Sequence, residues 1–445
     1  MRRSIFPQGI RMLCGVPPRL FRFVFAVLLV FVCRAAFAQR LSPLVSAPDW
    51  ARLEAFHDTI TRAEFQRLLD KAYAPGGAAA GVIEVRENEA MVLKTLTPPE
   101  PFVLRFAKDA KSAKAVPRDW RAVSALPRTK AERPLDGVKI ALDPGHIGGD
   151  WALMEGRSFQ RGQDRSVREG DMTLLVAQLA APKLRALGAE VSFVRDANAP
   201  ASPFTVDALR PAARKEMQLL GIAAARENYD GPHDPQKRET VQWHAERLFY
   251  RVAEIHERAR RVREKIRPDL AVCIHFNGTD WRDPEHPDFA EKEDLHVMVN
   301  GCFSADELRF DDQRFEMLLR LLTRSHAEEL AAAAPLAKAL ADATGLPPFT
   351  YFGGNAVRAG ADKYVWARNL LANRIFECPV VYLEPYCMNS ELTYARIQAG
   401  DYEGEREVAG KMRRSIFREY ADAIVAGLRS HCAKSRHAQT GSVPK

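Results

Sequence analysis

Two stretches decide the fold class: Val138-Lys139-Ile140-Ala141-Leu142-Asp143-Pro144-Gly145-His146 and Leu270-Ala271-Val272-Cys273-Ile274-His275-Phe276-Asn277. In each, a short run rich in Val, Ile and Leu is followed by polar or turn residues and a histidine. Such runs are typical of buried strands. In an open α/β sheet, ligands bind just beyond the carboxyl ends of the strands. The two stretches therefore predict that His146 and His275 lie where two imidazoles could share one metal ion.

Strand and helix patterns alternate from Leu135 onward. We expect strands at 138–142, 191–194, 270–274, 295–299 and 380–383. We expect helices at 171–187, with a kink or break at Pro182, at 327–340 and at 409–428. This alternation predicts an α/β domain over residues 135–432, in which a mixed sheet is flanked by helices.

The N-terminal 38 residues read as a signal peptide. Residues 1–22 carry several arginines and no acidic residue, and an apolar run follows at 23–32. The small-x-small motif Ala36-Phe37-Ala38 then predicts cleavage before Gln39. Because the apolar run is too short for a comfortable membrane span, we expect a periplasmic or secreted protein with no integral span in its mature form.

Residues 39–107 predict a small N-terminal α+β unit. Thr61 and Glu64 form a capping-box pattern that opens a helix, and alternation over 81–93 predicts strands. Residues 108–134 are basic, contain prolines and lack periodicity, so they read as a linker. Residues 433–445 are expected to form a disordered tail.

Residues 199–267 form a long, mostly polar segment with a helical pattern, clearest at 237–265. We interpret the basic run 258–263 as a solvated helix face, with a basic grip on an anionic wall as the lesser alternative. His244 and His256 read as exposed helix residues.

Charge and cysteine content restrict the partners and the metal chemistry. The net charge of +8 suits an anionic partner, but no nucleic-acid-binding motif is present, so we expect no nucleic acid partner. Five cysteines follow the leader, an odd number that cannot pair completely, and Cys378 with Cys387 is the pair we consider for a disulfide. The absence of a CxxC pair argues against a thiolate zinc site.

A catalytic zinc site needs a third protein ligand and an open position. Glu169, at the start of a predicted helix, and Glu155 are the candidates, and the pattern alone does not choose between them. Hydrolysis also needs a base to take a proton from the attacking water. Glu384 fits because it directly follows the predicted strand at 380–383.

With these residues in place, the chain resembles the zinc-dependent N-acetylmuramoyl-L-alanine amidases of the family 3 type, the bacterial cell-wall amidases. The resemblance is carried by four stretches in the family's order, at 140–150, 169–174, 269–277 and 379–389. It implies a phosphorylase/hydrolase-like fold and one Zn²⁺ held by His146, Glu169 and His275, which selects Glu169 over Glu155. It also implies Glu384 as general base and then general acid, and peptidoglycan as the substrate, cleaved between N-acetylmuramic acid and L-alanine.

Departures from the family pattern leave other functions open. Phe276 replaces a small residue and could reshape a cleft beside the metal, and the segment 199–267 is longer than usual. A zinc amidohydrolase or carboxypeptidase-like enzyme acting on small acyl-amino acids or free muropeptides is the alternative. A wall-binding protein without activity is a further rival.

Some family members hold an inhibitory helix over the metal until a protein activator removes it. Glu246, Glu254 and Glu257 in the segment 199–267 are the acids that could approach a zinc in this chain. We therefore keep autoinhibition as a hypothesis, with a simple structural insertion as the alternative. Deleting the segment should raise activity if the hypothesis holds.

Overall fold

The computed structural model describes residues 42–222, 226–231, 233–279 and 288–437. The predicted signal peptide at 1–38 lies outside these residues, as does most of the predicted tail. Among the described residues, no helix is both long enough and apolar enough to cross a membrane.

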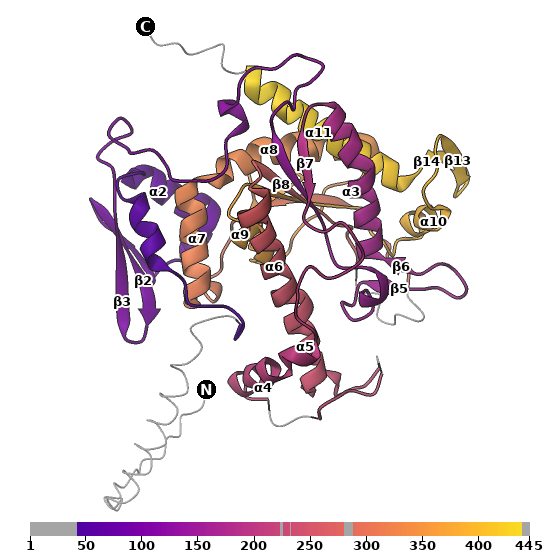
Figure 1. Cartoon of the computed structure of the whole chain (residues 1–445), viewed down its shortest axis with the longest axis horizontal. Helices are drawn as coiled ribbons and strands as arrows, with labels where there is room; N and C mark the ends of the chain where they lie inside the picture. The colour runs from indigo at the N-terminus through magenta and orange to yellow at the C-terminus, as the bar shows by residue number, and fades with distance from the viewer. Residues whose placement is uncertain (1–41, 223–225, 232, 280–287, 438–445) are drawn as a thin grey trace, which may run out of the picture.

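A mixed sheet forms the centre of the molecule (Figure 1). Among the described residues it has seven strands, in the order β10-β11-β9-β12-β8-β4-β7. Strands β7, β4, β8 and β12 are parallel to one another. In contrast, β9 is antiparallel to β12, and β10 is antiparallel to β11. The bounds are Lys139–Pro144 (β4), Glu190–Phe193 (β7), Leu270–Ile274 (β8), Leu295–Val299 (β9), Val357–Arg358 (β10), Val365–Ala367 (β11) and Val380–Pro385 (β12). The predicted mixed sheet is confirmed, and all five predicted strands are present. The short β10 and β11 carry too few residues for a pattern to appear.

Helices cover both faces of this sheet because its strands are apolar on both sides. Leu270, Val272 and Ile274 of β8 face the helices α3, α8 and α11, whereas Ala271 and Cys273 face α6 and α9. The helix bounds are Glu169–Ala186 (α3), Glu254–Arg260 (α6), Ser325–Thr344 (α8), Leu371–Ile375 (α9) and Ile416–His437 (α11).

Two helices differ in part from their predictions. α3 continues through Pro182, so of the predicted kink or break the break is absent. The last helix begins at Ile416 rather than 409, because the hairpin of β13 (Glu405–Val408) and β14 (Lys411–Arg414) occupies the earlier residues. The two turn residues of this hairpin, Ala409 and Gly410, both have positive φ, as a tight hairpin turn requires. The helix then extends to His437, so residues 433–437 of the predicted tail are helical.

The N-terminal unit combines short helices with a three-stranded antiparallel sheet. Its elements are a 3₁₀ helix at Trp50–Phe56, α2 (Arg62–Leu68), β1 (Ile83–Val85), β2 (Glu89–Leu96) and β3 (Pro99–Arg105). Thr61 caps α2 by accepting a hydrogen bond from the backbone N–H of Glu64, as the capping box predicts.

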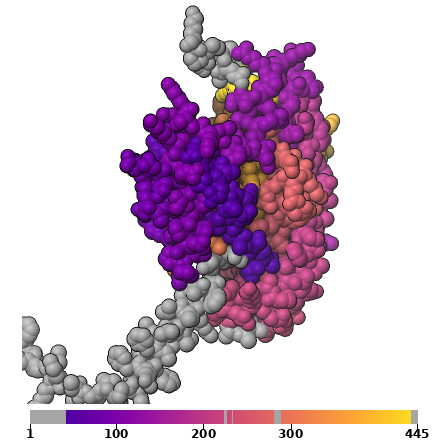
Figure 2. Space-filling view, turned by 60° about the vertical axis from the view of Figure 1, so that its left-hand side comes forward, coloured from indigo at the N-terminus to yellow at the C-terminus, as the bar shows by residue number. Residues whose placement is uncertain are grey.

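This unit does not stand apart from the rest of the chain (Figure 2). Its apolar residues share one core with α7 (Asp311–Thr323), and the buried Arg314 of α7 donates to the carbonyl oxygens of Leu93 and Lys94. The segment 108–134 has little regular structure, as expected for a linker, yet it buries Trp120, Val123 and Leu126. The N-terminal unit is therefore packed onto the α/β domain.

The segment 199–267 is largely helical, as predicted. It contains α4 (Arg210–Leu219), α5 (Val241–Leu248) and α6, with π-helical turns at Phe249–Ala253 and Arg261–Ile266. Its apolar side packs around Ile147, the residue after His146. The expectation that His244 is exposed is wrong, because it is buried with its Nδ1 2.7 Å from Glu216 Oε2. His256, also expected to be exposed, is half-buried, and its Nε2 is buried.

Candidate metal centre

Neighbouring strand ends deliver the two histidines to one edge of the sheet. β4 and β8 are parallel, with Pro144 paired to Ile274, and Gly145 donates its N–H to the Ile274 carbonyl at 2.9 Å. His146 and His275 follow directly. The prediction that both imidazoles lie at the carboxyl edge of the sheet is confirmed.

Glu169, the first residue of α3, lies between them. Its Oε2 is 3.2 Å from His146 Nε2, and its Oε1 is 3.2 Å from His275 Nδ1. The two rings are nearly perpendicular, with centroids 5.2 Å apart. One ligand atom from each of the three side chains lies within 4.8 Å of the others. The structure thus groups the three residues that the sequence motifs suggested.

The bonding of Glu169 fits a cation at this position. The carboxylate is 1% exposed, and its Oε1 accepts a hydrogen bond from the Phe276 backbone N–H. Its Oε2 is buried without a hydrogen-bond partner, since the contact to His146 lacks hydrogen-bond geometry. Burial raises the pKa of Glu169, but His146, His275 and the nearby Arg157 outweigh burial and lower it to about 2. Two imidazoles and an ionised carboxylate are a donor set that zinc accepts.

Glu155, the alternative third ligand, contacts the other ring nitrogen of His146. Its Oε1 is 3.5 Å from His146 Nδ1, and its Oε2 accepts the Ile147 N–H at 2.9 Å. A carboxylate on the far nitrogen of a metal-binding imidazole commonly orients the ring. Both glutamates therefore belong to the site, but only Glu169 lies in the three-residue group.

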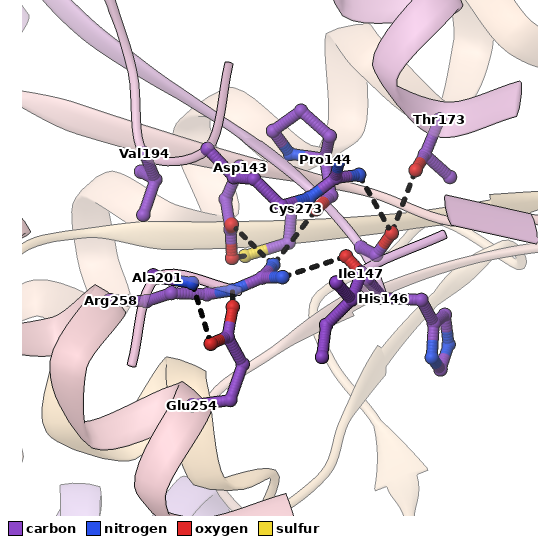
Figure 3. A network of polar contacts seen from close by, with 12 residues as sticks. Asp143, Pro144, His146, Ile147, Thr173, Val194, Ala201, Glu254, Arg258 and Cys273 are labelled. Carbon is purple, nitrogen blue, oxygen red and sulfur yellow. Dashed lines mark hydrogen bonds and ion pairs between the residues drawn. The ribbon is translucent and has the colours of Figure 1, made fainter. Parts of the chain in front are cut away.

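Arg258 of α6 holds the loop that carries His146 (Figure 3). His146 has a left-handed φ of 59°, which a non-glycine residue adopts at a cost. Arg258 donates to the carbonyls of Pro144 (2.8 Å) and His146 (2.7 Å), and it pairs with Asp143 and Glu254. In Figure 3 the imidazole of His146 points away from this network.

Arg258 corrects our interpretation of the basic run 258–263 as a solvated helix face. Its side chain is only 1% exposed. Two carboxylates compensate its charge, one from the neighbouring helical turn and one from the end of β4. A run of arginines looks solvated in sequence because a partner such as Asp143, far along the chain, gives no local signal.

Glycines allow the site's segments to approach closely. A Cβ at Gly145 would lie 2.2 Å from Cε1 of His275, and a Cβ at Gly170 would lie 2.2 Å from the Gly148 nitrogen. Gly145 therefore leaves room for the His275 ring. Gly170 lets the first turn of α3 reach the loop after His146.

Glu384 occupies the next strand end, on β12 beside β8. Its Oε2 lies 3.1 Å from Nε2 of His296 on β9, the residue directly opposite in the antiparallel pairing. Burial raises the pKa of Glu384, but the hydrogen bond and charge of His296 and the charge of His275 outweigh it, so the net direction is down. Glu384 is therefore ionised at neutral pH, as a general base must be.

His296 is a site residue that the sequence analysis missed. It stands inside an apolar run, where a histidine looks like a filler of the core. Its position opposite Glu384 depends on the antiparallel pairing of β9 with β12, which no local pattern reveals.

The ring of Phe276 lies in the core and not in a cleft beside the candidate metal ligands, contrary to our expectation. It is 2% exposed and packs against Tyr386, Phe417 and Tyr420. The ring next to His275 is instead Tyr382, stacked at a centroid distance of 5.2 Å.

The three acids proposed for an inhibitory helix have partners elsewhere. Glu246 accepts from the Tyr229 hydroxyl, Glu254 binds Arg258, and Glu257 pairs with Arg260. Cys378 and Cys387, the pair considered for a disulfide, are both free and buried.

The fold and the site together define an α/β protein with a candidate His-Glu-His metal centre. The chain matches no protein-family model and no curated protein. Among solved structures it is similar to the N-acetylmuramyl-L-alanine amidase Ami1 from Mycobacterium smegmatis, at 18% identity and a TM-score of 0.34, over 67% of this chain and 99% of that one. It is also similar to the CwlD amidase from Clostridioides difficile in complex with the GerS lipoprotein, at 12% identity and a TM-score of 0.36, over 66% and 98%. A third is the N-acetylmuramoyl-L-alanine amidase AmiC2 of Nostoc punctiforme, at 16% identity and a TM-score of 0.34, over 66% and 97%.

Proposed function

We propose that this chain is a zinc-dependent hydrolase that cleaves the amide bond between N-acetylmuramic acid and L-alanine in peptidoglycan. The observation that carries the metal chemistry is the buried carboxylate of Glu169, which faces both imidazoles and whose Oε2 has no hydrogen-bond partner. The substrate class is supported by the four sequence motifs and their order. The net charge of +8 suits an anionic wall polymer.

His146, Glu169 and His275 would hold the zinc through the atoms that face one another. When bound, zinc in such a site supplies Lewis-acid activation of water and of the scissile carbonyl. Glu155 and Arg258 act on the protein side, since they fix the ring and the loop of His146.

Glu384 would move the proton. As a carboxylate it accepts a proton from the attacking water, and it then donates that proton to the nitrogen of the leaving L-alanine. The C–N bond breaks, the lactyl group keeps a carboxylate, and the stem peptide leaves with a free amine. The lowered pKa of Glu384 supports the first of these roles.

The site of action follows from the predicted leader. A signal peptide at 1–38 would send the chain to the periplasm or outside the cell, where peptidoglycan lies.

A protein activator is a further expectation from the family resemblance. The other partners of Glu246, Glu254 and Glu257 argue against these three acids as inhibitory zinc ligands.

The rival function, on small acyl-amino acids or free muropeptides, loses one of its two reasons. Phe276 lies in the core and not in a cleft beside the metal, so only the long segment 199–267 favours a different substrate. We therefore keep the muramoyl-alanine bond as the proposed target.

Mass spectrometry of the products tests this proposal. The mature chain, loaded with zinc, is incubated separately with intact sacculi and with soluble muropeptides, beside the variant Glu384→Gln. We expect free stem peptides from sacculi with the native chain and none with the variant. Cleavage of soluble fragments alone would favour the rival, and intact glycopeptides in every sample would overturn both.

A further inference from the structure

We propose that His296 is a positioning residue for this reaction, which holds the carboxylate of Glu384 in place through a hydrogen bond from Nε2. The inference rests on the proposed function, because it assigns a role to the partner of the proposed base. It concerns a residue outside the three metal ligands and outside the four motifs.

Strand pairing fixes the contact between the two side chains. His296 and Glu384 are directly opposite in the antiparallel pair of β9 and β12, so both project on the same face of the sheet. His296 Nε2 lies 3.1 Å from Glu384 Oε2. The His296 side chain is 3% exposed, whereas that of Glu384 is 23% exposed. The imidazole thus contacts the carboxylate from its buried side, and the exposed side of the carboxylate stays open to a substrate.

Only one ring nitrogen of His296 has a partner among the described residues. Nδ1 is buried without a hydrogen-bond partner, whereas Nε2 lies 3.1 Å from Glu384 Oε2. Because an ionised carboxylate oxygen can only accept, the Nε2–H of His296 is the donor in this contact.

Two aromatic rings hold this imidazole in its orientation. Phe349 lies 4.5 Å from it between centroids, and Tyr351 lies 5.6 Å away in an edge-on arrangement. Tyr351 is itself held by Arg368, which donates to its hydroxyl at 3.3 Å. A base that must meet a proton at a set position benefits from a partner that cannot rotate.

Other charged and titratable groups also face Glu384. They are His275 directly after β8, Glu169 at the start of α3, and the phenols of Tyr351, Tyr382 and Tyr420. The three phenols have a raised pKa and stay neutral. Among these groups, His296 makes the hydrogen bond to the carboxylate. Loss of that bond should raise the pKa of Glu384, so the ionised base would form only at higher pH.

Three substitutions at His296 separate this role from simple packing. Gln places an amide nitrogen as many bonds from Cβ as Nε2 is, so it can keep the hydrogen bond. Asn is one bond shorter, and Phe fills the volume without a donor. We expect His296→Asn and His296→Phe to lower kcat about 10- to 100-fold with little change in KM, and His296→Gln to stay within a few-fold of the native chain.

The pH profile and a direct titration decide the matter. The acid limb of kcat should move to higher pH in His296→Phe and return toward the native position in His296→Gln, at unchanged zinc content and melting temperature. Infrared difference spectra of the zinc-loaded full chain against Glu384→Gln would follow the carboxyl itself, with or without activity. An unmoved carboxyl titration and acid limb would overturn the inference. A moved carboxyl titration in a chain inactive on peptidoglycan would overturn the proposed function and support the contact.

Discussion

Glu169 is the residue on which the proposed metal centre depends most directly. Its carboxylate faces both histidines, and one of its oxygens has no other hydrogen-bond partner. Glu155 touches the same histidine from behind, at the ring nitrogen that points away from the centre. The two glutamates therefore have different expected effects on zinc.

Substitution of Glu169 by Gln should abolish stoichiometric zinc binding, because one of three ligands loses its charge. Glu155→Gln, the matched control, should keep one zinc per chain with an affinity about 10- to 100-fold lower. Titration against a chromophoric chelator measures both. Retention of tight zinc by Glu169→Gln, with loss in Glu155→Gln, would reverse the assignment of ligand and orienting residue.

The sequence could predict the site residues that lie at the ends of apolar runs. His146 and His275 follow apolar strands that are visible locally, Glu384 lies near the end of a third, and Glu169 opens a helix. His296 and Arg258 could not be found in this way, because their roles depend on strand pairing and on carboxylates far along the chain. Phe276 was misjudged because its direction depends on packing against α11.

At the scale of elements, α6 is the support of the loop that carries His146. Arg258 joins this helix to two carbonyls of the loop and to Asp143. A buried arginine with two carboxylate partners is costly to remove, because the carboxylates remain buried without compensation.

Arg258→Met should therefore lower the free energy of unfolding by about 3–5 kcal/mol and weaken zinc binding. Arg260→Met is the control on the same helix, since the Arg260 side chain is 41% exposed and pairs with Glu257 and Glu264; we expect a much smaller loss, because water screens an exposed ion pair. Urea denaturation of both variants compares them. Equal, small losses would contradict a supporting role for Arg258.

The contact of Arg258 with the His146 loop changes what we expect from deletion of residues 199–267. As an inhibitory segment it would raise activity when removed, but the structure places the anchor of the His146 loop inside it. We expect the deletion variant to lose zinc and to be largely insoluble, as measured by metal analysis and size-exclusion chromatography. A soluble, zinc-loaded and more active variant would instead support autoinhibition.

Element bounds were predictable where a strand is apolar throughout, as in β8 and β9, which have the predicted residues. The last helix was placed too early because the hairpin of β13 and β14 is exposed and charged, with no apolar alternation to mark it. α7 was not predicted, and its packing partner is the N-terminal unit about 200 residues earlier in the chain.

At the scale of the whole molecule, buried histidines make the stability depend on pH. Burial lowers the pKa of His326 to about 4, and burial with nearby arginines does the same for His256. In the unfolded chain both have a pKa of about 6.5. The unfolded state therefore binds more protons between these values, and the folded state loses stability as the pH falls from about 6.5 toward 4.

Each of these histidines should contribute up to about 1.4 kcal/mol of lost stability per pH unit in that window. Urea denaturation at pH 7.5 and pH 5 measures the loss. His326→Gln should show a smaller difference between the two pH values than the native chain. The same difference in both proteins would mean that His326 does not titrate as its burial implies.

Zinc K-edge X-ray absorption on the purified full chain tests the central claim most directly. We predict one zinc per chain with two imidazole nitrogens and oxygen ligands at about 2.0–2.2 Å, and no such spectrum from Glu169→Gln. A chain that takes up no zinc, or a zinc with sulfur neighbours at about 2.3 Å from the buried cysteines, would contradict the His146, Glu169 and His275 centre.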